Sequence, residues 1–215
     1  MLKKENIYWL GGSPCSGKST IAEYLVRDFG FQYYKCDDHL DEYIDRGVLL
    51  NIPVMKRLKT FTTDEMWLRD VDDQVQITVD YYMATFDMIL KDLEDKNFED
   101  EKVVVEGAAI MPVLVKSHKI NPNRYVCMVP SRDFQLEKYA ERAWAYDRLM
   151  DSSDPNQCFK NWMERDCRFA ERIKKEAKGY GLNSIVVDGI KSIDENYEIV
   201  KRFFKGESDA AFEMF

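Results

Sequence analysis

Residues 12–19, with the sequence GSPCSGKS, constrain the fold of this 215-residue chain more than any other segment. They fill every fixed position of the pattern G-x-x-x-x-G-K-[ST], in which a glycine-rich loop joins a strand to a helix. The apolar run IYWL at residues 7–10 precedes the loop, as expected of a buried parallel strand. After the loop, Ile21, Leu25 and Phe29 recur four residues apart, which indicates one buried face of a helix.

The composition of this loop is suited to binding a polyphosphate. Backbone N–H groups freed by the glycines surround phosphate oxygens in such loops, together with the positive end of the following helix. We expect Lys18 to reach the β and γ phosphates and the hydroxyl of Ser19 to ligate Mg²⁺. The alternative is a glycine-rich turn that carries a lysine by chance. The residues expected to bind a nucleoside triphosphate are Gly12, Ser13, Pro14, Cys15, Ser16, Gly17, Lys18, Ser19 and Thr20.

Composition narrows the class of protein. The formal net charge is -8, so a broad basic surface for nucleic acid is not expected. The first strand begins within a few residues of the start, which leaves no room for a signal peptide, and no apolar stretch approaches membrane-spanning length. We therefore expect a soluble, cytoplasmic protein. The 5 cysteines include no C-x-x-C pair, which favours reduced thiols, and Cys15 is either a reactive thiolate or a small residue that fits the turn.

Four further apolar runs predict strands, and helical patterns separate them. The runs lie at residues 31–36, 103–105, 124–129 and 185–187. Strands that alternate with helices throughout indicate the α/β class with a mainly parallel sheet. We assign one domain to residues 1–205 and an acidic tail to residues 206–215.

Local signals predict the intervening helices. The sequence HLDEYIDRG predicts a short helix that Gly47 ends, and an irregular stretch follows through Thr63. A later helix begins at Ser131 and runs toward Leu149, before residues 152–156 break it. A long helix precedes the third strand, because apolar residues there step by three and four positions. These residues are Val75, Val79, Tyr82, Phe86, Ile89 and Leu93.

Acidic residues lie where three of the predicted strands end. Asp37 and Asp38 follow the second strand, Glu106 ends the third and Asp188 follows the fifth. Ligands of open parallel sheets bind beyond the carboxyl ends of the strands, so these side chains should face the loop. An aspartate there holds Mg²⁺ through water, or orients an acceptor hydroxyl and takes its proton. We expect Asp37 or Asp38 to be this base, and Ser19, Asp37 and Glu106 to lie near the metal. The alternative is that Asp37 or Asp38, and likewise Glu106, caps the helix that follows it.

Arginines concentrate between residues 142 and 172, where two predicted helices flank a Ser/Asp/Pro loop. Arg165, Arg168 and Arg172 fall at i, i+3 and i+7, so they share one helical face. With Arg142 and Arg148, such a row can close over a triphosphate, neutralise developing charge and exclude water. We predict a lid here. The alternative is a solvated face on which the arginines pair with neighbouring carboxylates.

With these motifs in this order, the chain resembles the small P-loop kinases of the adenylate kinase, shikimate kinase and cytidylate kinase group. The loop GSPCSGKS carries most of the resemblance. The segment VVVEGAAIMP, the arginine-rich segment and VVDG at residues 186–189 extend it over nearly the whole chain. The resemblance implies a three-layer P-loop NTPase fold with a five-stranded parallel sheet of order 2-3-1-4-5, a helical lid over about residues 142–172, and ATP with Mg²⁺.

The resemblance also implies roles for single residues. Arg142 is expected to stack near adenine, and a later lid arginine, Arg148 or Arg165, to contact phosphate. The stretch after Asp188 is expected to border the base. In shikimate-kinase-like members an aspartate after the second strand approaches the acceptor hydroxyl and magnesium, and Asp37 and Asp38 match that place.

The acceptor-binding region is expected at about residues 38–100. Within it, Trp67, Tyr81 and Tyr82 are interpreted as core side chains, although the stretch around Trp67 also suits an acceptor site. Adenylate-type kinases usually carry an arginine after the third strand to bind an acceptor phosphate, but EGAAIMP at residues 106–112 has none.

We therefore expect an ATP-dependent phosphotransferase that acts on a hydroxyl of an unidentified small molecule. One alternative is a regulatory module that binds a nucleotide without efficient transfer. The other is a nucleotide or nucleic-acid end kinase, for which the acidic balance of the chain is unfavourable.

Overall fold

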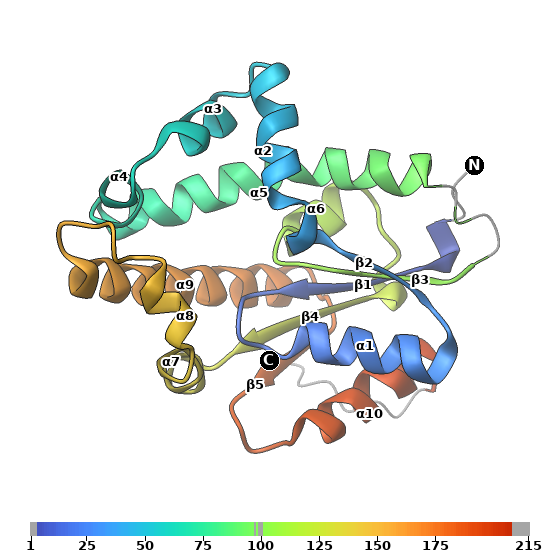
Figure 1. Cartoon of the computed structure of the whole chain (residues 1–215). Helices are drawn as coiled ribbons and strands as arrows, with labels where there is room; N and C mark the ends of the chain where they lie inside the picture. The colour runs from blue at the N-terminus through green and yellow to red at the C-terminus, as the bar shows by residue number, and fades with distance from the viewer. Residues whose placement is uncertain (1–3, 97, 99–100, 208–215) are drawn as a thin grey trace.

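The structure is a computed structural model that describes residues 4–96, 98 and 101–207. Five parallel strands form one sheet in the order β2-β3-β1-β4-β5. The predicted α/β class, the parallel sheet and its 2-3-1-4-5 order are confirmed (Figure 1). From residue 208 onward, the predicted tail at 206–215 lies outside the described residues. The strands are β1 (Ile7–Gly12), β2 (Gln32–Lys35), β3 (Val103–Glu106), β4 (Tyr125–Pro130) and β5 (Ser184–Val187).

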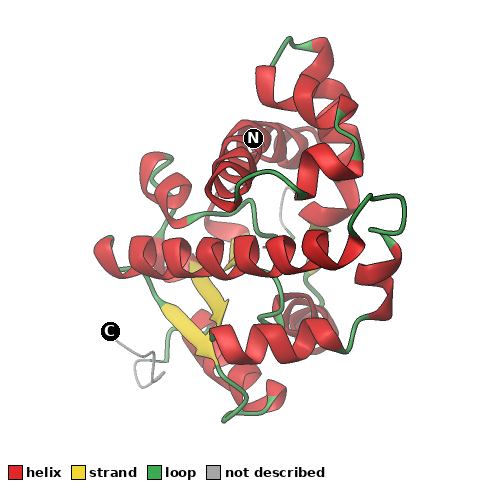
Figure 2. Cartoon of the chain, turned by 90° about the vertical axis from the view of Figure 1, so that its left-hand side faces the viewer, coloured by secondary structure: helices red, strands yellow, loops and turns green. Residues whose placement is uncertain are grey.

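Helices cover both faces of the sheet, because its central strands are apolar on both faces. In β1, Ile7 and Trp9 pack on one side and Tyr8 and Leu10 on the other. Figure 2 shows helices on both sides of the strands, so the molecule has three layers. One layer contains α1 (Lys18–Phe29) and α10 (Ile193–Phe204); the other contains α5 (Val71–Asp95), α6 (Pro112–Ser117) and α9 (Pro155–Gly179).

Three short helices project beyond the sheet as one group (Figure 1): α2 (Leu40–Leu49), α3 (Pro53–Thr60) and α4 (Thr63–Trp67). A polar cluster fixes the base of this group. The hydroxyls of Tyr34 and Tyr43 contact each other, and Tyr34 also donates to Asp92 at 3.0 Å. Arg46 pairs with Asp92 at 2.6 Å. The cluster therefore joins β2, α2 and α5.

Gly47 lies inside α2 and does not end a helix, so the predicted stop there is wrong. A Cβ atom at this position would come within 2.3 Å of Met55 Cγ in α3. A glycine is needed because α2 and α3 pack closely against each other. The predicted irregular stretch through Thr63 is also wrong, because it contains α3, which begins at Pro53.

The single helix predicted from Ser131 toward Leu149 is interrupted. It is replaced by α7 (Arg132–Ala140) and α8 (Ala143–Asp147). Between them Arg142 has a non-helical backbone, with φ −101° and ψ 85°. Its guanidinium lies 5.2 Å from the ring of Tyr139 and 5.8 Å from that of Trp144. These contacts across the break favour the interruption.

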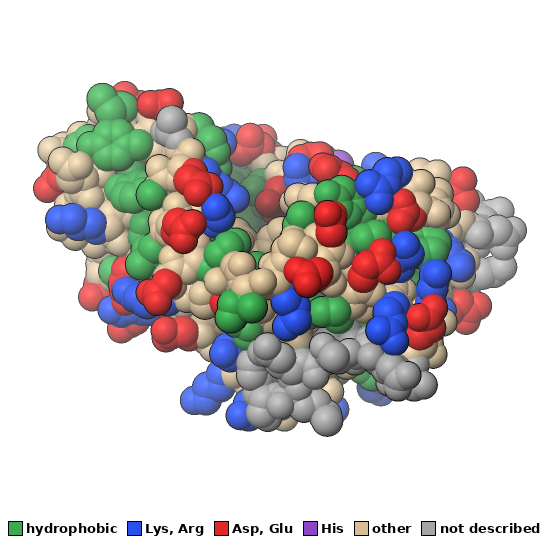
Figure 3. All heavy atoms as spheres, turned by 90° about the horizontal axis from the view of Figure 1, so that it is seen from below, with side chains coloured by type: hydrophobic (Ala, Val, Ile, Leu, Met, Phe, Trp, Pro, Cys, Tyr) green, Lys and Arg blue, Asp and Glu red, His purple; other side chains and the backbone are tan. Residues whose placement is uncertain are grey.

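The surface mixes charges of both signs. Figure 3 shows lysine, arginine and acidic side chains interspersed over one face of the molecule, without a patch of a single sign. Across the described ranges, we find no helix with both the length and the apolar character that crossing a membrane requires.

Gly47→Ala tests the close packing of α2 on α3. We expect it to lower the free energy of unfolding by about 1–3 kcal/mol, because a Cβ atom there must displace the buried Met55. Gly179→Ala is the matched control, since no atom lies within 4 Å of the position that a Cβ atom would take there, at the end of α9. That change should stabilise by about 0.4–1 kcal/mol. Urea unfolding of both variants gives the two signs, and equal effects would contradict the packing argument.

Candidate functional site

The loop at residues 12–19 folds tightly against β4. Gly12 has a φ of 126°, and a Cβ atom there would lie 1.9 Å from the backbone oxygen of Met128. The N–H of Ser13 donates to that same oxygen at 3.0 Å. Gly17 has a φ of 77° and turns the chain into α1. One glycine therefore lets β1 approach β4, and the other begins the helix.

Lys18, the first residue of α1, directs its side chain back into the loop. Its Nζ donates to the backbone oxygen of Ser13 at 2.7 Å and to Ser16 Oγ at 3.3 Å. The first intrahelical bond runs from Ile21 to Gly17 at 3.1 Å, so the N–H groups before Ile21 have no partner within the helix. An ammonium group and free N–H groups thus meet at one helix terminus, an arrangement that suits an anion.

Glu106 ends β3 beside Lys18. Its Oε1 lies 3.9 Å from Lys18 Nζ, and its Oε2 accepts the hydroxyls of Ser19 at 3.1 Å and Tyr33 at 3.2 Å. Burial raises the pKa of Glu106, because only 2 % of the residue is exposed, while Lys18 opposes this shift. The helix-cap alternative does not hold, since α6 begins several residues later, at Pro112. Tyr33 was not predicted to lie at the site; its place in β2, the strand beside β3, brings it there.

Ser19, Glu106 and Asp37 offer the oxygen donors that Mg²⁺ prefers. Asp37 lies near enough to Glu106 for its charge to raise the pKa of that carboxyl. In the ranges that the structure covers, no group of three or more His, Cys, Asp or Glu side chains could hold a metal ion alone. Ser19 and Glu106, whose side-chain oxygens lie 3.1 Å apart, are placed to offer a hydroxyl and a carboxylate oxygen to such a cation.

Asp37 and Asp38 lie in different surroundings. Asp38 Oδ1 lies 3.8 Å from Lys35 Nζ, and its side chain is 67 % exposed. The negative charge of Asp37 adds to the rise that burial causes in the pKa of Glu106. It adds in the same way to the pKa of Tyr82, which burial also raises. Neither aspartate caps α2, because both lie within the short 3-10 helix that precedes it. Both aspartates are exposed, and they differ in that Asp38 pairs with Lys35 while the charge of Asp37 acts on Glu106.

A cavity beside the loop, here called the loop cavity, has a volume of about 460 Å³. Cys15, Gly17 and Thr20 line it from the loop side, and Arg142 lines it from the α7–α8 junction. Asp188 does not line it; its Oδ1 accepts the N–H of Ile190 at 3.0 Å and holds the turn after β5. The stretch beyond that turn contributes Lys191, Ile193 and Asn196 to the wall.

Cys15 separates this cavity from an aromatic cluster. Its side chain packs against a buried group that includes Trp162 and Met163. Burial raises the pKa of the Cys15 thiol to about 11, and Arg142 opposes the shift. The thiol is therefore protonated at neutral pH, which favours the interpretation of Cys15 as a packed turn residue over a reactive thiolate.

The second cavity, here the aromatic cavity, has a volume of about 490 Å³ and lies between α2–α5 and α9. The rings of Trp67 and Trp162 stack in its wall, with centroids 4.7 Å apart. Tyr81 and Tyr82 line it too, so these three predicted core residues, Trp67 included, border a cavity. Two of the predicted lid arginines, Arg148 and Arg165, also line it.

The row of three arginines on α9 is paired with carboxylates. Arg165 Nε lies 2.7 Å from Asp166 Oδ1, and its Nη1 donates to Thr78 at 3.1 Å. Arg168 pairs with Glu164 at 2.9 Å and with Asp72 at 2.6 Å, and Arg172 pairs with Glu176 at 2.9 Å. Arg168 and Arg172 thus match the solvated-face alternative, whereas Arg165 is turned toward the aromatic cavity.

A hydrogen-bonded clasp joins the 142–172 segment to α4. Asp64 Oδ1 accepts the hydroxyl of Ser152 at 2.5 Å and the N–H of Ser153 at 2.9 Å. Its Oδ2 accepts the hydroxyl of Ser153 at 2.6 Å. Asn161 adds a bond from α9 to the carbonyl oxygen of Trp67 at 2.8 Å. Residues 152–161 of the segment are therefore fixed to α4 beside the aromatic cavity, whereas Arg142 lines the loop cavity.

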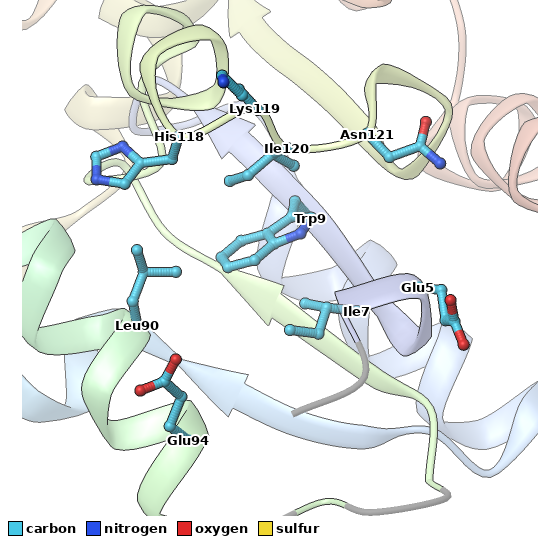
Figure 4. Close-up of a pocket in the computed structure, with 9 residues that line it drawn as sticks. All are labelled: Glu5, Ile7, Trp9, Leu90, Glu94, His118, Lys119, Ile120 and Asn121. Carbon is cyan, nitrogen blue, oxygen red and sulfur yellow. The ribbon is translucent and has the colours of Figure 1, made fainter. Parts of the chain in front are cut away.

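Figure 4 shows a further cavity, of about 180 Å³, at the start of β1. Trp9 lies at its centre, with Leu90 and Ile120 directed toward it, while Glu5 points away. This cavity lies at the amino end of β1, whereas the loop follows the carboxyl end. It is therefore separate from the loop, and it shares no lining residue with the loop cavity or with the aromatic cavity.

Comparisons with known proteins leave the function open. No protein-family model matches the chain, and no curated protein matches it. A solved structure, of an uncharacterized protein from Eubacterium ventriosum ATCC 27560, is similar at 15% sequence identity with a TM-score of 0.45. The match covers 93% of this chain and 98% of that one.

Glu106→Gln tests the burial of this carboxylate. Because burial raises its pKa, the ionised form opposes folding above the ordinary value of 4.5 and the neutral form does not. The variant should therefore melt at a higher temperature than the parent at pH 8, and this difference should disappear as the pH falls below 4.5. Glu195→Gln is the control of opposite sign, since the Ser192 N–H lowers the pKa of that carboxyl. A less stable Glu106→Gln protein at pH 8 would mean that the attraction of Lys18 outweighs burial.

Asp64→Asn tests the clasp. We expect faster amide hydrogen exchange in residues 148–158, because an amide replaces one of the carboxylate oxygens that accept from Ser152 and Ser153. Asp151→Asn serves as the control, since Asp151 is an exposed residue of the same loop. Equal exchange in the two variants would show that Asp64 does not hold the segment.

Proposed function

We propose that this protein is an ATP-dependent phosphotransferase of the P-loop kinase type, which transfers the γ-phosphate to a hydroxyl of a small molecule. The observation that carries the proposal is the meeting of Lys18, Ser19 and Glu106 at the N-terminus of α1. An ammonium, a hydroxyl and a buried carboxylate at a helix terminus are the groups that a magnesium nucleotide requires. In this proposal ATP lies with its base in the loop cavity and its phosphates along residues 12–19.

Lys18, Ser19 and the backbone of the first turn of α1 each have a role in this proposal. Lys18 exchanges its contacts with Ser13 and Ser16 for oxygens of the β and γ phosphates. The N–H groups of the first turn of α1 bind the remaining oxygens. Ser19 and Glu106 would hold Mg²⁺, which neutralises phosphate charge when bound. Arg142 borders the base from the edge of the loop cavity.

Asp37 is proposed as the general base and Asp38 as a surface residue. The acceptor hydroxyl attacks the γ-phosphorus, and the bond from that phosphorus to the bridging oxygen of ADP breaks. The hydroxyl proton passes to the Asp37 carboxylate. Both aspartates are exposed, but Asp38 pairs with Lys35, whereas Asp37 lies close enough to Glu106 for its charge to raise the pKa of that carboxyl, which supports this choice.

The aromatic cavity favours transfer over a purely regulatory role. A module that only binds a nucleotide needs no second cavity on the far side of its γ-phosphate. In this proposal the aromatic cavity, of about 490 Å³ and with Arg148 and Arg165 in its wall, holds the acceptor. Phosphoryl transfer places cations around the charge that develops on the moving group. We propose residues 142–172 as the lid that supplies them.

Lys18→Ala and a pair of aspartate variants test the proposal. Lys18→Ala should weaken ATP binding by about 10- to 150-fold, since charge-assisted hydrogen bonds are lost. Asp37→Asn should lower acceptor-stimulated ADP release by about 10²- to 10⁴-fold at unchanged ATP affinity. Asp38→Asn should have a much smaller effect. ATP affinity is measured by calorimetry and ADP release across a panel of alcohols, sugars, hydroxy acids, nucleosides and a 5′-hydroxyl oligonucleotide.

The outcomes separate the competing functions. Tight ATP binding with no acceptor stimulation supports the regulatory module and contradicts transfer. Stimulation by the oligonucleotide alone supports the nucleic-acid end kinase. If Asp38→Asn abolishes ADP release and Asp37→Asn does not, the assignment of the base is wrong.

A further inference from the structure

The walls of the aromatic cavity specify the chemistry of the molecule that fills it. We infer that the acceptor is an amphipathic hydroxy acid, with a flat and mainly apolar body, one acidic group and the hydroxyl that receives phosphate. The inference rests on the proposed function only for the transfer step. Binding of such a molecule to the cavity can be tested without any transfer.

The apolar body follows from the rings in the wall. Trp67 and Trp162 stack with an interplanar angle of 25°, and Tyr81 and Tyr82 add two more rings, with centroids 5.4 Å apart. Trp162 and the Arg165 guanidinium pack on the Trp67 ring, and the rings together give the cavity an apolar wall, which favours an apolar ligand because its burial excludes water. The remaining apolar wall consists of Leu40, Ile44, Leu58, Met66 and Ile77.

Several polar groups in this wall are already paired within the protein. The Thr78 hydroxyl donates to the backbone oxygen of Gln74 at 2.9 Å and accepts from Arg165 at 3.1 Å. The Tyr81 hydroxyl donates to the backbone oxygen of Leu40 at 3.4 Å. A sugar or polyol needs a partner for each hydroxyl that it buries, since an unpaired buried hydroxyl is unfavourable. The cavity therefore disfavours polyhydroxylated acceptors.

The acidic group follows from the cations on the α9 side. Arg165 uses Nε for Asp166 and Nη1 for Thr78, and its guanidinium lies 4.8 Å from the ring of Trp67. Arg148 is an exposed residue at the edge of the cavity, 5.2 Å from the centroid of the Trp144 ring, and no carboxylate of the described ranges forms a salt bridge with it. A planar guanidinium without a carboxylate partner binds an acid through two parallel hydrogen bonds.

Asp41 and Asp37 set the orientation of the acceptor. Asp41 lines the cavity from α2, opposite the arginines, so it repels an acid placed on that side. The acidic group therefore points to Arg148 and the hydroxyl points to Asp37. This orientation agrees with the place of Asp37 in the short 3-10 helix directly before Leu40 and Asp41, which line the cavity.

Three probes and two variants test the inference by calorimetry in the absence of ATP. The probes are 6-(hydroxymethyl)-2-naphthoate, its neutral 6-methyl analogue, and quinate, which is acidic but polyhydroxylated. We expect the naphthoate to bind at least about tenfold more tightly than either other probe. Arg148→Gln should remove its advantage over the neutral analogue. Arg202→Gln, which replaces an exposed arginine on α10, should keep that advantage.

The binding results either support or overturn the inferred chemistry of the acceptor. Equal or tighter binding of quinate, no detectable binding of any probe at millimolar concentration, or an unchanged preference in Arg148→Gln overturns the inference. Thermal melting of each variant shows that it is folded. If the naphthoate binds as expected but ADP release is never stimulated, the inference holds and the proposed transfer fails. If polyols stimulate ADP release and aromatic acids do not, transfer holds and the inference fails.

Discussion

The buried carboxylate of Glu106 is the constraint on which the arrangement of this molecule depends. A charge with so little water around it is tolerated only where cations and hydrogen-bond donors surround it. Lys18 and Ser19 come from α1 and Tyr33 comes from β2. Because β3 lies between β1 and β2, the strand order itself brings these donors to the end of β3. The sheet, the loop and the first helix therefore share one electrostatic centre.

The sheet was predictable because its signals are local. Each strand is a short apolar run between turn residues, and the loop pattern requires a strand before it and a helix after it. The failures at Gly47 and around Arg142 have a different origin. Helix propensity alone predicts that Gly47 ends a helix. In the structure α2 continues past Gly47, where the missing side chain lets Met55 of α3 pack closely. The break between α7 and α8 accompanies contacts of Arg142 with two rings.

The position of Glu106 at the end of a strand could be predicted from the sequence, whereas the side-chain partners around the candidate site could not. Helical periodicity places Arg165, Arg168 and Arg172 on one face, but it cannot show that Asp72 of α5 reaches Arg168. Asp37 and Asp38 are adjacent and chemically equal, so only the path of the backbone separates them. The clasp at Asp64 had no sequence signal, because its partners Ser152 and Ser153 are distant in the chain.

The group of helices α2–α4 is tied to its surroundings at two places, Asp92 near the sheet and Asp64 at the far end. Between these ties, Leu58 of α3 contributes to the wall of the aromatic cavity. A substitution of Leu58 therefore alters the wall of this cavity while Lys18, Ser19 and Glu106 keep their places. The architecture is therefore modular in an evolutionary sense: a new ligand preference can arise by replacing one short stretch of surface helix within an unchanged chemical framework.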